Sequence, residues 1–241
     1  MYGWRGRIGI IVSPPNTVVE CEFDQMAPEG VSVHAARLGR PEGAAAILSE
    51  DVVLQTNADL PRAASSLAEL RLDVVVFAHT AGSMLGGLQY DEDLIAMMEE
   101  KVGCPAVTTG SAAVAALKGA GVRRLALLTP YPDEMTVKEA EFIQLAVPSL
   151  EVVSQRSLGT ATGIAIGDLA PETAYREARN IDTSTADALF LSGTNWRTIE
   201  VISAMEADLG MPVFTANQVT MWSGLKKLNV AARPGFGSLF G

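Results

Sequence analysis

The sequence predicts an α/β protein built from two similar lobes, each a doubly wound parallel sheet, with a ligand cleft between them. Short apolar runs rich in β-branched residues alternate with longer stretches of helical periodicity. This alternation is typical of buried parallel strands joined by right-handed helical crossovers. The two halves also resemble each other, as expected for a repeated unit of roughly 115 residues. A single long doubly wound sheet is the alternative that the pattern leaves open.

Eight apolar runs are expected to be strands, and several helices are expected to begin just after them. The strands are expected at 8–12, 31–35, 74–78, 106–108, 125–129, 151–154, 188–191 and 213–215. Ser, Thr or Asn stands in the cap region of four of the helices, which are expected to begin near Asn16, Ser111, Thr198 and Gln218. Pro171 favours the first position of a further helix.

The internal repeat sets the expected domain boundaries. Residues 7–16 resemble 124–133, residues 73–80 align without gaps against 187–194, and 104–110 match 211–217. We therefore expect an N-terminal lobe over 1–117 and a C-terminal lobe over 118–228, with the tail 229–241 packing back on the first lobe. The apolar end of the tail, 236–240, would be costly to leave in water, so it packs on its own chain or on a neighbour, and a homo-oligomer stays open.

Composition and charge exclude several classes of protein. The 241 residues include 18 Lys+Arg and 28 Asp+Glu, a formal net charge of −10, which argues against nucleic acid and anionic membranes as partners. Two cysteines cannot form a disulfide framework, and no Cys/His group has the spacing of a zinc site, so no metal is expected. The apolar run at 8–12 is too short for a signal peptide, and no run is long enough to span a membrane. A cytoplasmic protein is the expectation.

The ends of the predicted strands supply the candidate binding residues. In open α/β sheets ligands bind beyond the carboxyl ends of the strands, and with two facing lobes these ends meet in one cleft. The residues there are small, hydroxylic or amidic: Ser13, Asn16, Thr80, Ser83, Ser111, Gly193, Thr194, Asn195 and Asn217. Helix N-termini favour an anion, and no Lys or Arg except Arg197 lies in these loops, so we expect a carboxylate held by neutral donors. The alternative is that these side chains only cap helices.

Two further residues are candidates for chemistry. His79 stands at a strand end and has an ordinary pKa near neutrality, which favours a general acid or base; a structural histidine is the alternative. Tyr131 stands between Pro130 and Pro132, which should fix the direction of its ring. Its hydroxyl could then donate to a developing oxyanion; the alternative is a packing tyrosine. Cys21 and Cys104 are not at strand ends, and we expect both to be small buried hydrophobes.

These loops resemble those of a known family. The segments that carry the resemblance are 13–17, 78–83, 130–131, 156–158, 192–198 and 232–240. In their order and spacing the chain is similar to the aspartate/glutamate racemase superfamily, in particular its maleate isomerase and arylmalonate decarboxylase branch. The resemblance implies two pseudosymmetric lobes, no metal or organic cofactor, and two catalytic cysteines on opposite faces of the substrate.

The resemblance also assigns residues. Asn16 and Tyr131 fall on carboxylate-binding positions, Thr80 falls in the pocket for an enediolate-like intermediate, and Thr194 and Asn217 match more loosely. His79 and Gly193 stand where the two cysteines are expected. Without a thiol, covalent addition to a double bond is disfavoured, and two-base racemisation lacks its second proton donor.

We therefore expect a cofactor-independent lyase or isomerase that acts next to a carboxylate of a small mono- or dicarboxylic acid. In this interpretation His79 replaces the thiol, with Thr80 and Tyr131 beside it. Two other hypotheses remain: a small-carboxylate binding protein that has lost catalysis, and a hydrolase in which His79 activates water.

Overall fold

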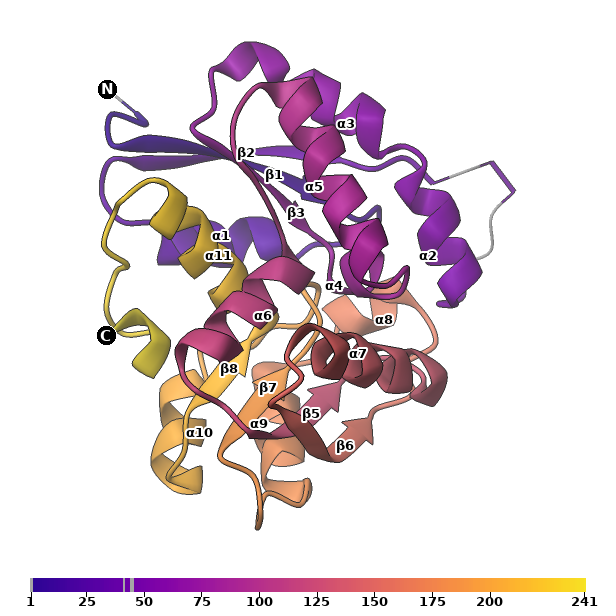
Figure 1. The fold of residues 1–241 in the computed structure, drawn as a ribbon, viewed down its shortest axis with the longest axis vertical. Coiled ribbons are helices and arrows are strands. Elements are labelled where there is room, and N and C mark those ends of the chain that lie inside the picture. The colour runs from indigo at the N-terminus through magenta and orange to yellow at the C-terminus, as the bar shows by residue number, and fades with distance from the viewer. Residues whose placement is uncertain (1, 41, 44–45) are drawn as a thin grey trace.

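The computed structural model describes residues 2–40, 42–43 and 46–241, and it contains two four-stranded parallel sheets (Figure 1). The strand orders are β2-β1-β3-β4 and β6-β5-β7-β8, so the same topology occurs twice. The two-lobe α/β prediction is thus confirmed, and the alternative of a single long sheet is wrong. The strands are β1 (Gly6–Val12), β2 (Val31–Arg37), β3 (Val74–Ala78), β4 (Ala106–Thr108), β5 (Arg124–Thr129), β6 (Glu151–Ser157), β7 (Ala188–Leu191) and β8 (Val213–Thr215).

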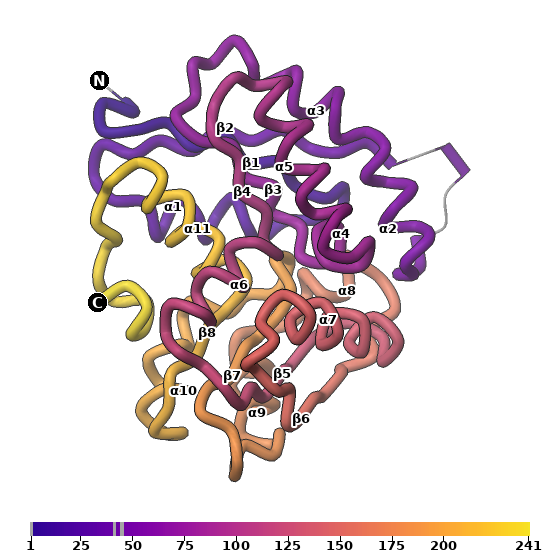
Figure 2. The backbone as a smooth tube through the Cα atoms, in the orientation of Figure 1, coloured from indigo at the N-terminus to yellow at the C-terminus, as the bar shows by residue number. Residues whose placement is uncertain are grey.

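Helices connect the strands and cover the sheets, as the backbone trace shows (Figure 2). They are α1 (Val19–Met26), α2 (Glu50–Asn57), α3 (Leu60–Leu67), α4 (Thr80–Met84), α5 (Leu88–Val102), α6 (Thr109–Gly119), α7 (Asp133–Ala146), α8 (Gly163–Gly167), α9 (Pro171–Asn180), α10 (Ile202–Leu209) and α11 (Ala216–Lys227), with short 3₁₀ turns η1 (Ala68–Leu70) and η2 (Ser238–Phe240).

The first sheet is buried on both faces because its residues alternate between two apolar clusters. Ile10 and Val76 belong to a cluster that includes apolar residues of α1 and α11. Ile11, Val75 and Phe77 belong to a second cluster, formed with α3 and α5. Successive side chains of a strand point to opposite faces. Burial on both faces explains why these strands read as continuous apolar runs.

Two helices link the lobes. Helix α6 follows β4 of the first sheet and leads into β5 of the second, whereas α11 follows β8 of the second sheet and packs on β3 of the first. The two helices pack on each other along the lobe boundary (Figure 1), where Thr220 Oγ1 donates to Thr109 Oγ1 at 3.2 Å. Because α6 and α11 link the two lobes in this way, the carboxyl ends of both sheets lie at the same boundary.

Helix starts agree with the sequence patterns at α9, which begins at Pro171, and within about a turn elsewhere. Asn16 lies just before α1, and its Oδ1 accepts hydrogen bonds from the N–H groups of Val18 and Val19, each at 3.0 Å. The helix expected near Thr198 is the exception, since α10 begins at Ile202.

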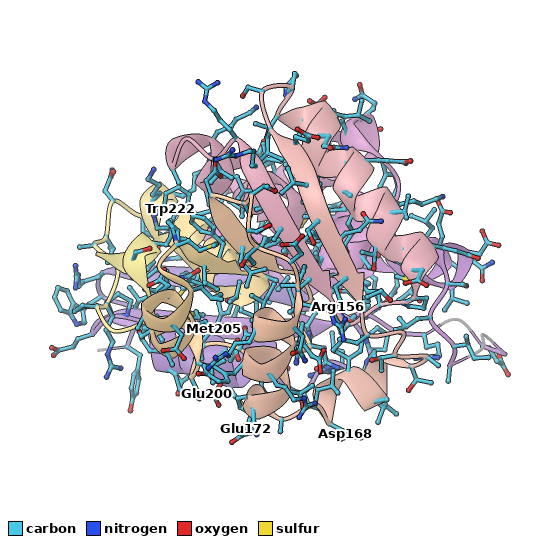
Figure 3. All side chains as sticks on the ribbon, turned by 90° about the horizontal axis from the view of Figure 1, so that it is seen from below. Arg156, Asp168, Glu172, Glu200, Met205 and Trp222 are labelled. Atoms are coloured by element: carbon cyan, nitrogen blue, oxygen red, sulfur yellow. The ribbon has the colours of Figure 1, made fainter. Side chains whose placement is uncertain are left out.

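The outer surface of the C-terminal lobe is rich in charge. Arg156 on β6 pairs with Glu177 on α9 at 2.7 Å. Asp168, Glu172 and Glu200 lie along one edge of this lobe in the view from below (Figure 3). No helix in the described part of the chain has the length and apolar character needed to cross a bilayer.

The C-terminal tail touches both lobes. Arg233 Nη1 donates to the Gln25 carbonyl on α1 at 3.1 Å. Further on, the Ser238 hydroxyl donates to Glu206 on α10 at 2.7 Å, and Phe240 is buried.

Candidate active site between the lobes

A small cavity of about 50 Å³ lies at the carboxyl ends of the two central strands of each sheet. The loops after β1, β3, β5 and β7 all contribute to it, together with α2, α8 and the segment before α2. Its lining comprises Ser13, Pro14, Pro15, Arg40, Ala46, Ile47, Leu48, Val52, Val53, Thr56, His79, Ala81, Tyr131, Gly163, Ile166, Thr194 and Asn195. This is where a doubly wound fold places its ligand, at the switch point of strand order.

His79 follows β3 and points into this cavity from the residue before α4. Its ring is 8% exposed and makes an edge contact with Phe77, with ring centroids 5.5 Å apart. Nδ1 is sealed from solvent and has no hydrogen-bond partner among the described residues. Nε2 is therefore the ring nitrogen that a ligand can reach. Burial lowers the pKa of His79 to about 4, so the imidazole is neutral near pH 7.

Tyr131 brings a hydroxyl group to the cavity that His79 lines, whereas Thr80 does not line this cavity. Tyr131 follows β5, lines the cavity and is 5% exposed. Burial, and then the nearby Glu139 carboxylate, raise the pKa of Tyr131; proximity to Thr80 and to the Ala81 amide opposes this. The phenol therefore stays protonated and able to donate. Thr80 is fully buried, and its Oγ1 has no well-formed hydrogen bond, although Tyr131 lies near it.

Asn16, Thr194 and Asn195 are largely occupied in joining the lobes. Asn16 Nδ2 donates to Thr194 Oγ1 at 3.3 Å, and Thr194 Oγ1 donates to the Ala78 carbonyl at 3.0 Å. Asn195 Nδ2 donates to the carbonyls of Pro15 and Gly163, and its Oδ1 accepts from an N–H of the loop after β1. Thr194 and Asn195 line the cavity, whereas Asn16 does not. These amides shape the cleft and leave few free donors for a ligand.

Asn217 belongs to a buried link between the lobes that the sequence did not indicate. Its Nδ2 donates to Glu22 Oε2 at 2.7 Å and to the Thr194 carbonyl at 3.0 Å. Glu22 Oε1 accepts from the Thr198 N–H at 2.8 Å. Burial raises the pKa of Glu22 to about 7, against the opposing effect of these hydrogen bonds. The pair ties α1 of one lobe to the loop after β7 of the other.

The remaining predicted residues lie outside the cavity lining or contribute backbone alone. Ser83 Oγ donates to the Thr80 carbonyl at 2.9 Å and accepts from the Gly110 N–H, so it joins α4 to α6. Ser111 forms a capping box with Thr108 at the start of α6. Gly193 has φ +116°, and an added Cβ would lie 2.9 Å from Pro130 Cγ. No side chain fits at Gly193 without strain.

Glu139 is a second buried carboxyl close to the site. It lies on α7, is fully buried, and accepts a hydrogen bond from Ser192 Oγ at 2.6 Å through Oε2. Oε1 has no partner among the described residues. Burial raises the pKa of Glu139 to about 8, so the group is mainly protonated near pH 7. Ser192 directly precedes Gly193, so this carboxyl holds the start of the loop after β7.

The remaining wall of the cavity, its roof, comes from segments that are not strand ends. Ile47 pairs with Thr162 in an isolated antiparallel bridge, and the Leu48 N–H donates to the Ala161 carbonyl at 2.8 Å. An ion pair between Glu50 on α2 and Lys138 on α7 also crosses the boundary. Beneath this bridge Val52, Val53 and Ile166 form an apolar wall, and Arg40 is the cation in the lining.

Neither cysteine lines the cavity. Cys21 is exposed on α1, so the expectation that it is a buried hydrophobe is wrong: the outer face of this short helix carries it. Cys104 is partly buried, and burial followed by the charges of Asp73 and Glu99 raises its pKa to about 11. The Cys104 thiol therefore lacks the setting of a reactive nucleophile.

Comparison with known proteins identifies the family. A family model described as arylmalonate decarboxylase matches residues 8–240. The chain belongs to the arylmalonate decarboxylase family. This family member is 28% identical to an arylmalonate decarboxylase of Bordetella bronchiseptica, over 97% of this chain and 95% of the relative. It is 26% identical to a maleate isomerase of Geobacillus stearothermophilus, over 97% and 96% of the two chains.

Solved structures agree with the fold of this family member. The maleate isomerase Iso of Pseudomonas putida S16 superposes with a TM-score of 0.88 at 24% identity, covering 98% of each chain. A crystal structure of arylmalonate decarboxylase gives a TM-score of 0.80 at 28% identity, covering 97% of this chain and 98% of the other. A cysteine-to-serine mutant of the Nocardia farcinica maleate cis-trans isomerase, with a TM-score of 0.87 at 24% identity, carries a covalently bound succinylcysteine intermediate.

The racemase-superfamily resemblance is thereby confirmed. His79 lines the cavity from one lobe, whereas Gly193 of the other lobe lies outside the lining, next to Thr194, which is part of it. His79 offers an ionisable group from one lobe. Gly193 offers backbone alone from the other, against Pro130 and the Tyr131 hydroxyl.

Proposed function

We propose that this family member is a cofactor-independent isomerase or lyase that acts at the carbon next to a carboxylate of a small organic acid. His79 moves the proton. The observation that carries the proposal is the placement of His79 in the interlobe cavity, with Nδ1 sealed and Nε2 left to the ligand. Among the described lining residues it is the one whose ordinary pKa lies near neutrality.

The neutral state of His79 favours proton abstraction as the first step. With a pKa of about 4, the imidazole enters the reaction with a free lone pair. Nε2 takes a proton from the carbon next to the carboxylate, and the electron pair of that C–H bond moves into the carboxyl group to form an enediolate. The imidazolium then returns the same proton to another carbon of the conjugated system. Atoms and charge are conserved over the two proton transfers, and the result is migration of a double bond.

Decarboxylation is the second candidate, and membership of the family favours it. Here the bond to a second carboxylate breaks, carbon dioxide leaves with no proton, and the enediolate takes its proton from an imidazolium. His79 must then be charged before the bond breaks. A bound dicarboxylate would favour this charged form of His79, because two nearby negative charges raise the pKa of a histidine.

The polar groups beside His79 suit a developing oxyanion in either reaction. The Thr80 hydroxyl is buried without a well-formed hydrogen bond, and the Tyr131 hydroxyl stays protonated. We assign Tyr131 as the donor to the enediolate and Ser13 and Thr194 as the surroundings of the carboxylate; Thr80 and Gly193 lie outside the cavity lining and flank these residues. Removing one such donor costs roughly 3–4 kcal/mol in the barrier of an enzyme that depends on it.

The absence of a thiol from the cavity lining argues against the covalent route. A succinylcysteine intermediate is recorded for the Nocardia farcinica isomerase mutant. The described lining of this cavity contains no cysteine, and Gly193 has no room for a side chain. A binding protein for small carboxylates is the competing function, because Gly193 supplies no acid on the second face of a substrate.

The experiment is an activity screen of the purified protein with maleate, aryl- and alkylmalonates and unsaturated monocarboxylates. Proton NMR in deuterium oxide follows both product formation and exchange at the carbon next to the carboxylate, and carbon dioxide release is measured in parallel. His79→Ala should lower turnover by about 10²–10⁴-fold. His34→Ala is the matched control, since His34 lies on β2 away from the cavity lining.

The outcomes separate the candidates. Deuterium exchange or double-bond migration without carbon dioxide supports the isomerase, and stoichiometric carbon dioxide supports the decarboxylase. Thermal stabilisation by a carboxylate without turnover indicates a binding protein and overturns the enzyme proposal. Equal turnover in wild type and His79→Ala removes His79 from the mechanism.

A further inference from the structure

Asn57 has an unused acceptor next to the sealed nitrogen of His79. Asn57 is the last residue of α2 and is 3% exposed. Its Oδ1 and His79 Nδ1 are both buried and without a partner among the described residues. Both atoms also lie within 3.0 Å of one point, the position that a Cβ on Gly82 would take. Two buried polar atoms of complementary capacity thus face the same small gap.

The orientation of the Asn57 amide is fixed by its other end. Nδ2 donates to the Gly82 carbonyl at 2.7 Å and lies 3.1 Å from the Tyr90 hydroxyl. Turning the amide over would place Oδ1 against the Gly82 carbonyl oxygen, where neither atom can donate. The acceptor Oδ1 is therefore held on the side of His79.

We propose that Asn57 is a positioning residue that fixes the tautomer of His79. In this arrangement His79 carries its proton on Nδ1 and donates it to Asn57 Oδ1, which leaves the lone pair of Nε2 directed at the cavity. The inference rests on the proposed function, because it explains how a neutral histidine becomes a base aimed at the substrate. It extends to this chain the general rule that a third group orients a catalytic base.

Gly82 makes the pairing feasible. A side chain at residue 82 would collide with the His79 ring and come within 2.9 Å of Asn57 Oδ1. In this structure the two polar atoms fall outside hydrogen-bonding geometry. A small rotation of the imidazole about its side-chain torsions closes the gap, and catalytic hydrogen bonds commonly tighten in this way when substrate binds.

One competing arrangement gives the opposite tautomer. His79 precedes α4, and from this position a side chain can accept a hydrogen bond from a backbone N–H of the first turn. Nδ1 would then be an acceptor and the proton would sit on Nε2. The structure shows no such side-chain cap bond at α4. The two arrangements therefore make opposite predictions for one observable.

The test reads the tautomer directly by NMR. Long-range ¹H–¹⁵N correlations of the ¹⁵N-histidine-labelled full chain show which ring nitrogen is protonated, and the sequence contains two histidines, His34 and His79. The wild type should show His79 protonated at Nδ1 near pH 7. Asn57→Ala should move the equilibrium toward Nε2–H. Asn57→Asp should keep Nδ1–H, because either carboxyl state retains an acceptor there. Tyr90→Phe is the control and should leave His79 protonated at Nδ1, as in the wild type.

Each outcome decides the proposal. A wild-type His79 protonated at Nε2 overturns it at once, even if the Asn57→Ala variant fails to fold. An Asn57→Ala variant that folds and keeps Nδ1–H also overturns it. Where a substrate is known, Asn57→Ala should lower kcat by about 10- to 100-fold with little change in KM, and Asn57→Asp should recover part of the loss. Because the NMR measurement needs no substrate, it stands even if the activity screen fails.

Discussion

Replacing Glu139 by glutamine should remove a large part of the loss of stability at alkaline pH. Glu139 is fully buried, accepts one hydrogen bond from Ser192 and has a pKa raised from 4.5 to about 8. The glutamine side chain in Glu139→Gln would have the same shape and still offer an acceptor to Ser192, but it cannot ionise. The comparison therefore isolates the effect of the carboxyl proton.

The direction of this pH effect depends on whether the folded or the unfolded chain holds the Glu139 proton. Below pH 4.5 both the folded and the unfolded chain hold it, so folding is not opposed. Between pH 4.5 and 8 the unfolded chain releases the proton while the folded chain keeps it, so the free energy of unfolding falls as pH rises. Each pH unit is worth about 1.36 kcal/mol, so the full effect of the 3.5-unit shift is about 5 kcal/mol.

Urea unfolding of wild type and Glu139→Gln at pH 5, 7 and 9 measures this. The wild type should lose about 4 kcal/mol relative to the variant between pH 5 and 9, because part of the full effect is already present at pH 5, and most of that difference should be present by pH 8. Glu141→Gln on the exposed face of the same helix is the control and should follow the wild type. Parallel pH dependence of wild type and Glu139→Gln would refute the reasoning, because it would mean that Glu139 ionises equally in both states.

Three further substitutions test the cleft. Gly193→Ala should destabilise the protein by about 1–3 kcal/mol in urea unfolding, because φ is +116° and the new Cβ would press on Pro130; unchanged stability would contradict the assigned backbone. Asn195→Ala removes three hydrogen bonds, two of which cross the lobe boundary, and should cost about 2–4 kcal/mol, with a matching fall in thermal midpoint; a loss under about 0.5 kcal/mol would mean that these bonds do not hold the lobes. Ser111→Ala breaks a capping box and should cost about 1 kcal/mol without changing carboxylate binding, since Ser111 lies outside the cavity; weaker binding measured by calorimetry would place it in the site.

The strands and the central part of the cavity could be predicted from the sequence because they obey strong local rules. Strands buried on both faces are continuous apolar runs, and all eight runs form strands in the structure. Parallel topology then places strand ends together, which is how Ser13, His79, Tyr131 and Thr194 reach one cavity. The repeat between the halves predicted the two lobes.

The roof and the buried carboxyls escaped the sequence analysis for physical reasons. Arg40, Leu48 and Ile166 reach the cavity through contacts between segments far apart in the chain, and no local pattern reports such contacts. Glu22 and Glu139 carry groups that are charged in water, and such groups are ordinarily expected to face solvent. Both lie on apolar faces of their helices; Met135 and Ile143, for example, flank Glu139 at helical spacing and are buried with it. In the sequence, a carboxyl residue on an otherwise apolar helix face was the signal that could have predicted that Glu22 and Glu139 are buried.

The most direct test of the central claim is an NMR titration of the two histidines with malonate as a small dicarboxylate probe. Malonate should bind between the lobes, shift the ring resonances of His79 and raise its pKa from about 4, because the bound anion favours the imidazolium. His34, which hydrogen-bonds Ser32 at 2.9 Å outside the cavity lining, should not respond. If malonate binds and leaves His79 unmoved, or moves His34 instead, the cavity is not the carboxylate site and His79 is not its base.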